Sequence, residues 1–202
     1  MSIVLYWHPM SSASPIACAL TELGIPHERV KVDLRAGDQR RPEYLAINPN
    51  GKVPTLTVDG APMFEALAIH LWLGHRYGVE RGLWPTAGTP ESLQALSWCT
   101  WAYVTYGTVL KQLHVATQGD EALRSSLHAA AALRGLSELL ALLDARLASQ
   151  PWMLGADYSP VDLVVASVLG YSAYLGAPVN DYPHVKAWLT QVQARPAMQI
   201  ER

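Results

Sequence analysis

The most informative part of this sequence is the run Asn48-Pro49-Asn50-Gly51-Lys52-Val53-Pro54. Its Asn, Pro and Gly residues are typical of a loop, and Pro54 to Val58 alternates enough to form the strand that follows. Asp59-Gly60 is a hairpin-turn signal before a short return strand at Pro62 to Phe64. Apolar residues crowd the positions after Glu65, which indicates the start of a helix. We therefore expect a loop, a β-hairpin and a helix in direct succession.

A strand-helix-strand unit precedes this stretch. Ile3 to Trp7 is rich in β-branched and aromatic residues and is predicted to be a buried strand. Ser14-Pro15 supplies a predicted N-cap with proline at the first helical position. His27 to Val32 can form a second strand, and the crossover rule makes it parallel to the first. With a short helical turn at Pro42 to Ala46, the predicted order over residues 1–80 is β-α-β-α-β-β-α.

Helices are predicted for the rest of the chain. Residues 81–87 include Gly82 and Pro85, which interrupt any periodic pattern, and they form the predicted linker. The predicted helices run from Glu91 to about Ala116, Glu121 to Ala148, Pro160 to Leu175 and Tyr182 to Ala194. The second of them carries an apolar stripe made of Leu136, Leu140, Leu143 and Leu147. The fold class is therefore an α/β domain over 1–80 and an all-α helical bundle over 88–202.

Composition limits the classes of partner. The chain has 202 residues, of which 50% are hydrophobic, and this is typical of a globular protein with a substantial core. Its 15 Lys and Arg against 17 Asp and Glu give a net charge of -2, which argues against binding to nucleic acid or to an anionic membrane surface. The N-terminus lacks the charged region of a signal peptide, and we see no membrane-spanning stretch. We expect a soluble, cytoplasmic protein.

The two cysteines and the histidines give no sign of a metal site or a disulfide. Cys18 and Cys99 each lie within an apolar helical pattern, which is typical of small buried side chains. The sequence has neither a CxxC nor an HExxH motif, and its seven histidines are scattered. We predict no metal.

The order of elements, together with three motifs, resembles the cytosolic glutathione S-transferase superfamily, in its bacterial type. The motifs are Asn48-Pro49-Xaa-Gly51-Xaa-Val53-Pro54, then Phe64-Glu65-Ala66-Xaa-Ala68-Ile69, then Ser159-Pro160-Val161-Asp162, which has the pattern of a helix capping box. The resemblance covers nearly the whole chain. It implies a thioredoxin-like N-terminal domain followed by an all-helical C-terminal domain, and it implies a homodimer.

The resemblance also implies a cis peptide bond before Pro54. The Val53 N–H and C=O would then face outward and pair with the cysteinyl backbone of glutathione, as in the addition of a short strand. Residue by residue, the family pattern places Val53 and Pro54 at this contact. The alternative is an ordinary loop before a strand.

The two carboxylate ends of glutathione have implied partners as well. Glu65 and Ala66 open a helix whose N-terminus favours an anion, and the resemblance assigns them to the γ-glutamyl end. Ala66 departs from the serine that is common in the family, so one hydrogen bond worth about 0.5–1.5 kcal/mol is missing. For the glycyl end, the resemblance points to Gln39, with Arg40 close by, and to Lys52. The alternative for the cationic residues is a solvated loop.

A hydroxyl in the first strand-helix loop activates the glutathione thiol in this superfamily. Alignment without a gap from Glu22-Leu23-Gly24 puts Met10 where serine-type members carry the catalytic serine, and Ser12 where β-class members carry a cysteine. Because Met10 cannot donate a hydrogen bond, Ser12 is our first catalytic candidate and Ser11 the second. Ser14 is assigned to the helix cap. The alternative is a loop that is merely polar.

The second substrate is expected against the first helix of the helical domain. Five residues there share one face, namely Cys99, Tyr103, Tyr106, Leu110 and Leu113. Tyr103 and Tyr106 could polarise a leaving group in such a pocket. The alternative is that this face belongs to the core or to a dimer interface.

The resemblance thus predicts a glutathione transferase that conjugates glutathione, as its co-substrate, to a small apolar electrophile in detoxification. A glutathione-dependent isomerase, dehalogenase or disulfide reductase on the same scaffold is an alternative. A non-catalytic, transferase-like interaction module is another, which the departures at Met10 and Ala66 make more credible.

Overall fold

The computed structural model describes residues 1–199 and divides into two compact units. The first contains Met1–Ala87 together with the segment that begins at Arg195, and the second is Gly88–Ala194. The C-terminal segment was expected in the helical domain, but Arg195 forms an ion pair with Glu22 of the first unit. Trp84, in the predicted linker, is buried as part of the first unit.

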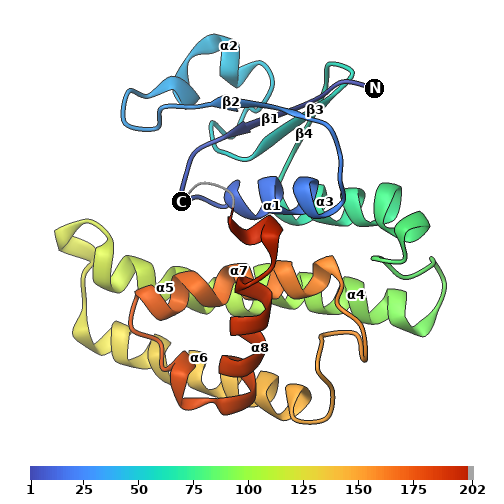
Figure 1. Cartoon of the computed structure of the whole chain (residues 1–202). Helices are drawn as coiled ribbons and strands as arrows, with labels where there is room; N and C mark the ends of the chain where they lie inside the picture. Colours follow the sequence, from blue (N-terminus) through green and yellow to red (C-terminus); the bar gives the residue numbers. More distant parts are fainter. Residues whose placement is uncertain (200–202) are drawn as a thin grey trace. The chain divides into compact units, whose positions relative to one another are not determined.

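The first unit is a mixed sheet with helices. Its elements are β1 (Ile3–Trp7), α1 (Ser14–Glu22), β2 (Glu28–Lys31), α2 (Pro42–Leu45), β3 (Thr55–Val58), β4 (Ala61–Phe64) and α3 (Ala66–Leu73). The strand order is β2-β1-β3-β4, with β2 parallel to β1 and the other pairs antiparallel. Helices α1 and α3 contact each other on one side of the sheet (Figure 1). The predicted β-α-β-α-β-β-α order and thioredoxin-like class are confirmed.

The ends of α1 and α3 differ from the prediction in detail. Helix α1 begins at Ser14 itself, so the predicted cap at Ser14 is wrong. The reason is that the N–H groups of Ile16 and Ala17 both donate to the Ala13 carbonyl oxygen at 3.1 Å, which makes Ala13 the N-cap. Helix α3 continues as a π-helical turn at Gly74–Gly78, where added side chains would collide with Trp84.

The second unit is all helical, as predicted. It contains α4 (Pro90–Thr100), α5 (Gly107–Gln118), α6 (Ser126–Leu147), α7 (Pro160–Tyr174) and α8 (Pro183–Gln193), which Figure 1 shows in green to red. The first predicted helix is interrupted by a π-helical turn at Trp101–Tyr106. The predicted leucine stripe of α6 is buried, and α6 packs against α5 and α8. By length and composition alone α6 could also span a membrane, but this packing is that of a bundle helix.

The predicted capping box at the start of α7 is confirmed and forms a wider buried cluster. Oδ2 of Asp162 accepts the Ser159 N–H at 3.0 Å. Oδ1 accepts the Met153 N–H and the indole N–H of Trp188, each at 2.8 Å. Burial raises the pKa of Asp162, while these donors oppose the shift. A single carboxylate therefore joins α7, α8 and the loop before them.

Candidate functional site

The loop from Asn48 to Pro54 is held from inside the first unit. The Val53–Pro54 peptide bond is cis, which confirms the expectation from the resemblance. The carbonyl oxygen of Lys52 accepts two hydrogen bonds, from the Tyr44 hydroxyl at 2.7 Å and from Nδ2 of Asn48 at 2.8 Å. Both donors also contact Oγ1 of Thr55, at 2.8 and 2.9 Å. Asn48, Tyr44 and Thr55 are all buried.

This network orients the next peptide unit. In a trans peptide, the C=O and N–H point in opposite directions, and the Lys52–Val53 bond is trans. Because the Lys52 C=O points into the buried network, the Val53 N–H points away from it. Tyr44 and Thr55 were missed as supporting residues, although the four-residue spacing of Tyr44 and Asn48 was a usable signal.

Gly51 is required by both its conformation and its surroundings. Its φ is +58°, and a Cβ at this position would lie 2.9 Å from the backbone oxygen of Gln39. The same position lies 3.1 Å from Nη1 of Arg40, so the arginine covers the loop. Gln39 and Arg40 are thus brought to the loop that carries Lys52, whose side chain is exposed. Their assignment to the glycyl carboxylate stays a prediction.

Gln39 offers an unusual acceptor. Its Nε2 donates to the Leu34 carbonyl at 3.2 Å, and its Oε1 is buried without a partner among the described residues 1–199. Buried polar atoms of this kind are uncommon and are often completed by a ligand or water. The second N–H of Nε2 can donate to a ligand carboxylate, and Oε1 can accept from a donor on the ligand.

Glu65 lies immediately before α3 in a strained backbone conformation. Its φ is +70° and its ψ is 113°, which is unusual for a residue with a side chain. Such outliers persist where the surrounding structure enforces them, and they cluster at ligand sites. The side chain makes no capping bond to the helix and is exposed, while Ala66 is buried. The backbone N–H groups at the start of α3 can therefore meet an anion beside the Glu65 carboxylate.

The serines of the first loop have distinct environments. Ser12 is exposed, and its hydroxyl donates to the Val53 carbonyl oxygen at 3.1 Å. The Ser11 hydroxyl donates to the His8 carbonyl at 2.6 Å as well as accepting the Ala13 N–H. The structure therefore brings Ser12, but not the Ser11 hydroxyl, to the loop around Val53. Met10 has a φ of 55° and is 88% exposed.

The two cysteines are buried within helices. Both are free and buried, and burial raises the pKa of Cys18 to about 11 and that of Cys99 to about 12. The expectation of small buried side chains is confirmed. Within residues 1–199, no group of three or more His, Cys, Asp or Glu residues is placed to hold a metal ion.

The two tyrosines predicted to contact a second substrate lie in the second unit. Tyr106 is fully buried, its hydroxyl lies 2.6 Å from Oγ of Ser172, and burial raises its pKa to about 12. Tyr103 is half-buried, and burial raises the pKa of its hydroxyl too. For Tyr106, these contacts favour the alternative that the face packs in the core.

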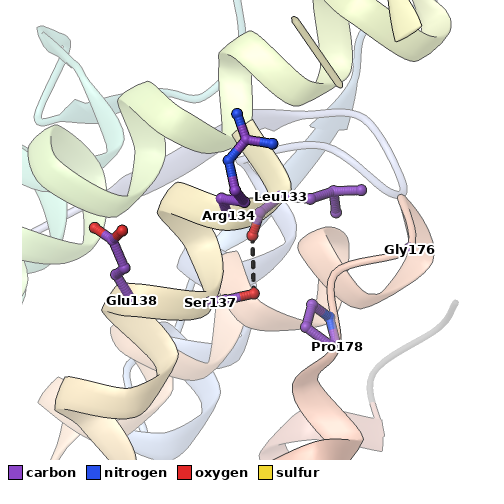
Figure 2. Close-up of a pocket in the computed structure, with 6 residues that line it drawn as sticks. All are labelled: Leu133, Arg134, Ser137, Glu138, Gly176 and Pro178. Carbon is purple, nitrogen blue, oxygen red and sulfur yellow. Dashed lines mark hydrogen bonds between the residues drawn. The ribbon is translucent and has the colours of Figure 1, made fainter. Parts of the chain in front are cut away.

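A surface hollow of about 450 Å³ is found elsewhere in the second unit. Figure 2 shows its lining, which comes from α6 and from the turn after α7: Leu133, Arg134, Ser137, Glu138, Gly176 and Pro178. The Ser137 hydroxyl donates a hydrogen bond to the Leu133 carbonyl oxygen at 2.9 Å. None of the predicted site residues lines this hollow.

Comparison with known proteins identifies the family to which both units are similar. Residues 10–76 match the glutathione S-transferase N-terminal domain, and residues 109–196 match the C-terminal domain. The disulfide-bond oxidoreductase YfcG of Escherichia coli (strain K12) is 30% identical over 96% of this chain and 92% of its own. The glutathione S-transferase hmp2 of Hypomyces subiculosus is 32% identical over 96% of this chain and 95% of its own length.

A solved structure extends the comparison to a bound ligand. The glutathione transferase BgramDRAFT_1843 from Burkholderia graminis has a TM-score of 0.85 and 26% identity, with 98% of this chain and 85% of that chain covered. That structure holds two glutathione molecules per subunit.

Proposed function

Because the chain belongs to the glutathione S-transferase superfamily, we propose that it is a transferase that activates the glutathione thiol for attack on an apolar electrophile. At the level of the family it is a glutathione-utilising enzyme; the reaction is our proposal. The observation that carries it is the fixed Lys52–Val53 peptide, with the Ser12 hydroxyl 3.1 Å from the Val53 carbonyl.

Glutathione would be held mainly by backbone groups. The Val53 N–H and C=O would pair with the cysteinyl residue, as one rung of an antiparallel ladder. The γ-glutamyl carboxylate would meet the N–H groups at Glu65 and Ala66, and the Glu65 side chain would meet the amino group. Lys52, with Gln39 beside it, would face the glycyl end. The arrangement supports a ligand with opposite charges at set positions along one extended chain.

The Ser12 hydroxyl would then face the sulfur. Lowering the pKa of a free thiol from about 8.5 by about 2 units requires about 2.7 kcal/mol of preference for the thiolate. One hydrogen bond to the anion supplies about 1.5–3 kcal/mol, and the N-terminus of α1 adds about 0.3–1 kcal/mol. The thiolate attacks the electrophilic carbon, a C–S bond forms, and the leaving group departs with its electron pair.

Calorimetry with glutathione and turnover of a chlorinated nitrobenzene test this proposal. We expect binding at or below millimolar concentration and a conjugation rate above that of free glutathione. Lys52→Met should weaken binding in a salt-dependent way. Lys111→Met, which removes an exposed lysine of the second unit, is the matched control and should bind normally. The absence of binding up to millimolar glutathione would overturn the proposal.

The oligomeric state, the cellular location and the physiological role belong to the same proposal. We infer a homodimer in the cytoplasm with a role in detoxification, as the resemblance to the superfamily implies. Sedimentation as a single 22.1 kDa chain would contradict the dimer.

A disulfide reductase is the second candidate, since one relative is a disulfide-bond oxidoreductase. Both cysteines are buried, which favours exchange without a protein thiol. Glutathione thiolate would attack a disulfide RSSR, forming GS–SR and releasing RS⁻. Comparing turnover of a small disulfide with that of the chlorinated nitrobenzene decides between the two reactions.

A further inference from the structure

The Ser12 hydroxyl donates to the Val53 carbonyl oxygen, which the proposed ligand would also use, and two donors on one oxygen weaken each other. We propose that glutathione itself triggers its activation: its cysteinyl N–H takes over the Val53 carbonyl oxygen, and the displaced Ser12 O–H turns to the sulfur. The inference rests on the proposed function and adds to it a step that depends on the bound ligand.

The resting contact is well suited to exchange. The Ser12 Oγ lies 3.1 Å from the Val53 oxygen, slightly beyond the usual range for a hydroxyl donor, and the serine is exposed. A hydroxyl has one proton to donate, so it cannot serve this oxygen and the sulfur together. Ser11 differs, because its bond to the His8 carbonyl is only 2.6 Å and its oxygen also accepts an N–H. Of the two, Ser12 is the one free to turn.

The direction of the exchange follows from charge. A hydrogen bond to a thiolate is roughly twice as strong as one between neutral groups. The Val53 carbonyl keeps a donor after the exchange, since the ligand N–H replaces the hydroxyl. The thiol proton leaves to solvent, and Ser12 keeps its own proton throughout. The bound thiolate is therefore favoured only when the tripeptide backbone is in place.

A ligand without an ionisable thiol separates this proposal from simple contact. S-Methylglutathione presents the same backbone, but its thioether is a weak acceptor. With this ligand, the Ser12 hydroxyl competes with the ligand N–H for the Val53 carbonyl oxygen, and the thioether offers it only a weak hydrogen bond. Removing the hydroxyl should therefore strengthen binding of S-methylglutathione while weakening ionisation of bound glutathione. A hydroxyl that merely contacts the ligand would move both properties in the same direction.

The experiment measures S-methylglutathione affinity by calorimetry and the pH dependence of thiolate absorbance for bound glutathione. For Ser12→Ala we expect S-methylglutathione affinity to rise about two- to fivefold, and the pKa of the bound thiol to rise by about 1–2 units. Ser12→Thr, which keeps a hydroxyl, should restore the low thiol pKa. Ser14→Ala, at the first residue of α1, is the matched control and should change neither value.

The outcomes distinguish the two proposals. Unchanged or weaker S-methylglutathione binding by Ser12→Ala, or an unchanged thiol pKa, overturns the exchange while leaving the proposed function standing. A wild-type protein that binds neither ligand overturns both. Circular dichroism of each variant confirms that the exposed position has not disturbed the fold.

Discussion

The support of the Lys52 carbonyl gives the sharpest test of how this site is built. Tyr44→Phe removes a hydroxyl that lies 2.7 Å from the Lys52 oxygen and 2.8 Å from Oγ1 of Thr55. Asn48 still bonds to both atoms, so the variant leaves neither of these polar groups without a hydrogen bond. We expect the free energy of unfolding to fall by about 1–2 kcal/mol.

Asn48→Ala should be more severe. It removes the bonds from Nδ2 to Lys52 and Thr55, and also the acceptor 3.1 Å from the Asn50 N–H. Three lost bonds correspond to about 2–4 kcal/mol. In the double variant the Lys52 carbonyl loses both of its side-chain donors, which adds about 1–2 kcal/mol beyond the sum of the single effects.

Urea titration measures these differences, provided that the slope m is the same in all variants. S-Methylglutathione calorimetry then tests function. Affinity should fall about two- to fivefold in Tyr44→Phe and more than tenfold in the double variant, because the Val53 N–H loses its direction. Additive stabilities within about 0.5 kcal/mol, or unchanged affinity in the double variant, would refute the reasoning.

Tyr182→Phe provides the matched control. It also removes a tyrosine bond to a backbone carbonyl, that of Ser137 at 2.8 Å, but in the second unit. Its effect on stability should be about 1 kcal/mol and should add to that of Asn48→Ala, with no change in ligand affinity.

Three further predictions concern the rest of the chain. Burial lowers the pKa of His70 to about 3 from 6.5, so the unfolded chain takes up a proton at this residue before the folded chain does. The free energy of unfolding should therefore fall by about 2 kcal/mol between pH 6.5 and pH 5. Urea titration at a series of pH values should show a weaker pH dependence in His70→Gln. Cys18→Ala and Cys99→Ala together should keep glutathione-dependent turnover within about threefold, and a larger loss at constant folded fraction would place a protein thiol in the mechanism. Gly51→Ala should lower the free energy of unfolding by about 1–2 kcal/mol more than Gly24→Ala does. Both glycines have nearly the same positive φ, but only Gly24 has open space where a Cβ would be added. Equal losses in the two variants would contradict the packing argument.

The order of elements could be predicted because each one has a local signal. Alternation marks the strands, and the leucine spacing of α6 marks a buried stripe. The π-helical turns have no such signal, since they extend helices whose periodic pattern continues through them. The packing of Trp84 over Gly74 and Gly78 joins residues from separate segments, and no local pattern reports it.

The site divides in the same way. Val53, Pro54 and Glu65 could be predicted because each lies in a short contiguous motif. The part played by Tyr44 and Thr55 depends on hydrogen bonds that exist only after the loop has folded. The cap at Ser14 was misassigned because only the folded loop shows that the Ala13 carbonyl accepts the first helical N–H groups, from Ile16 and Ala17.

The two departures from the family pattern affect different parts of the site. Ala66 replaces a hydroxyl, but the N–H groups at the start of α3 remain, so the anion keeps its backbone donors. Met10 is exposed in a left-handed conformation and carries no donor, so in the proposed mechanism Ser12 has to supply the hydrogen bond to the sulfur. Backbone groups fixed by a buried network tolerate most side-chain changes, whereas one exposed hydroxyl has no substitute. We therefore expect single substitutions to abolish thiol activation far more readily than glutathione binding.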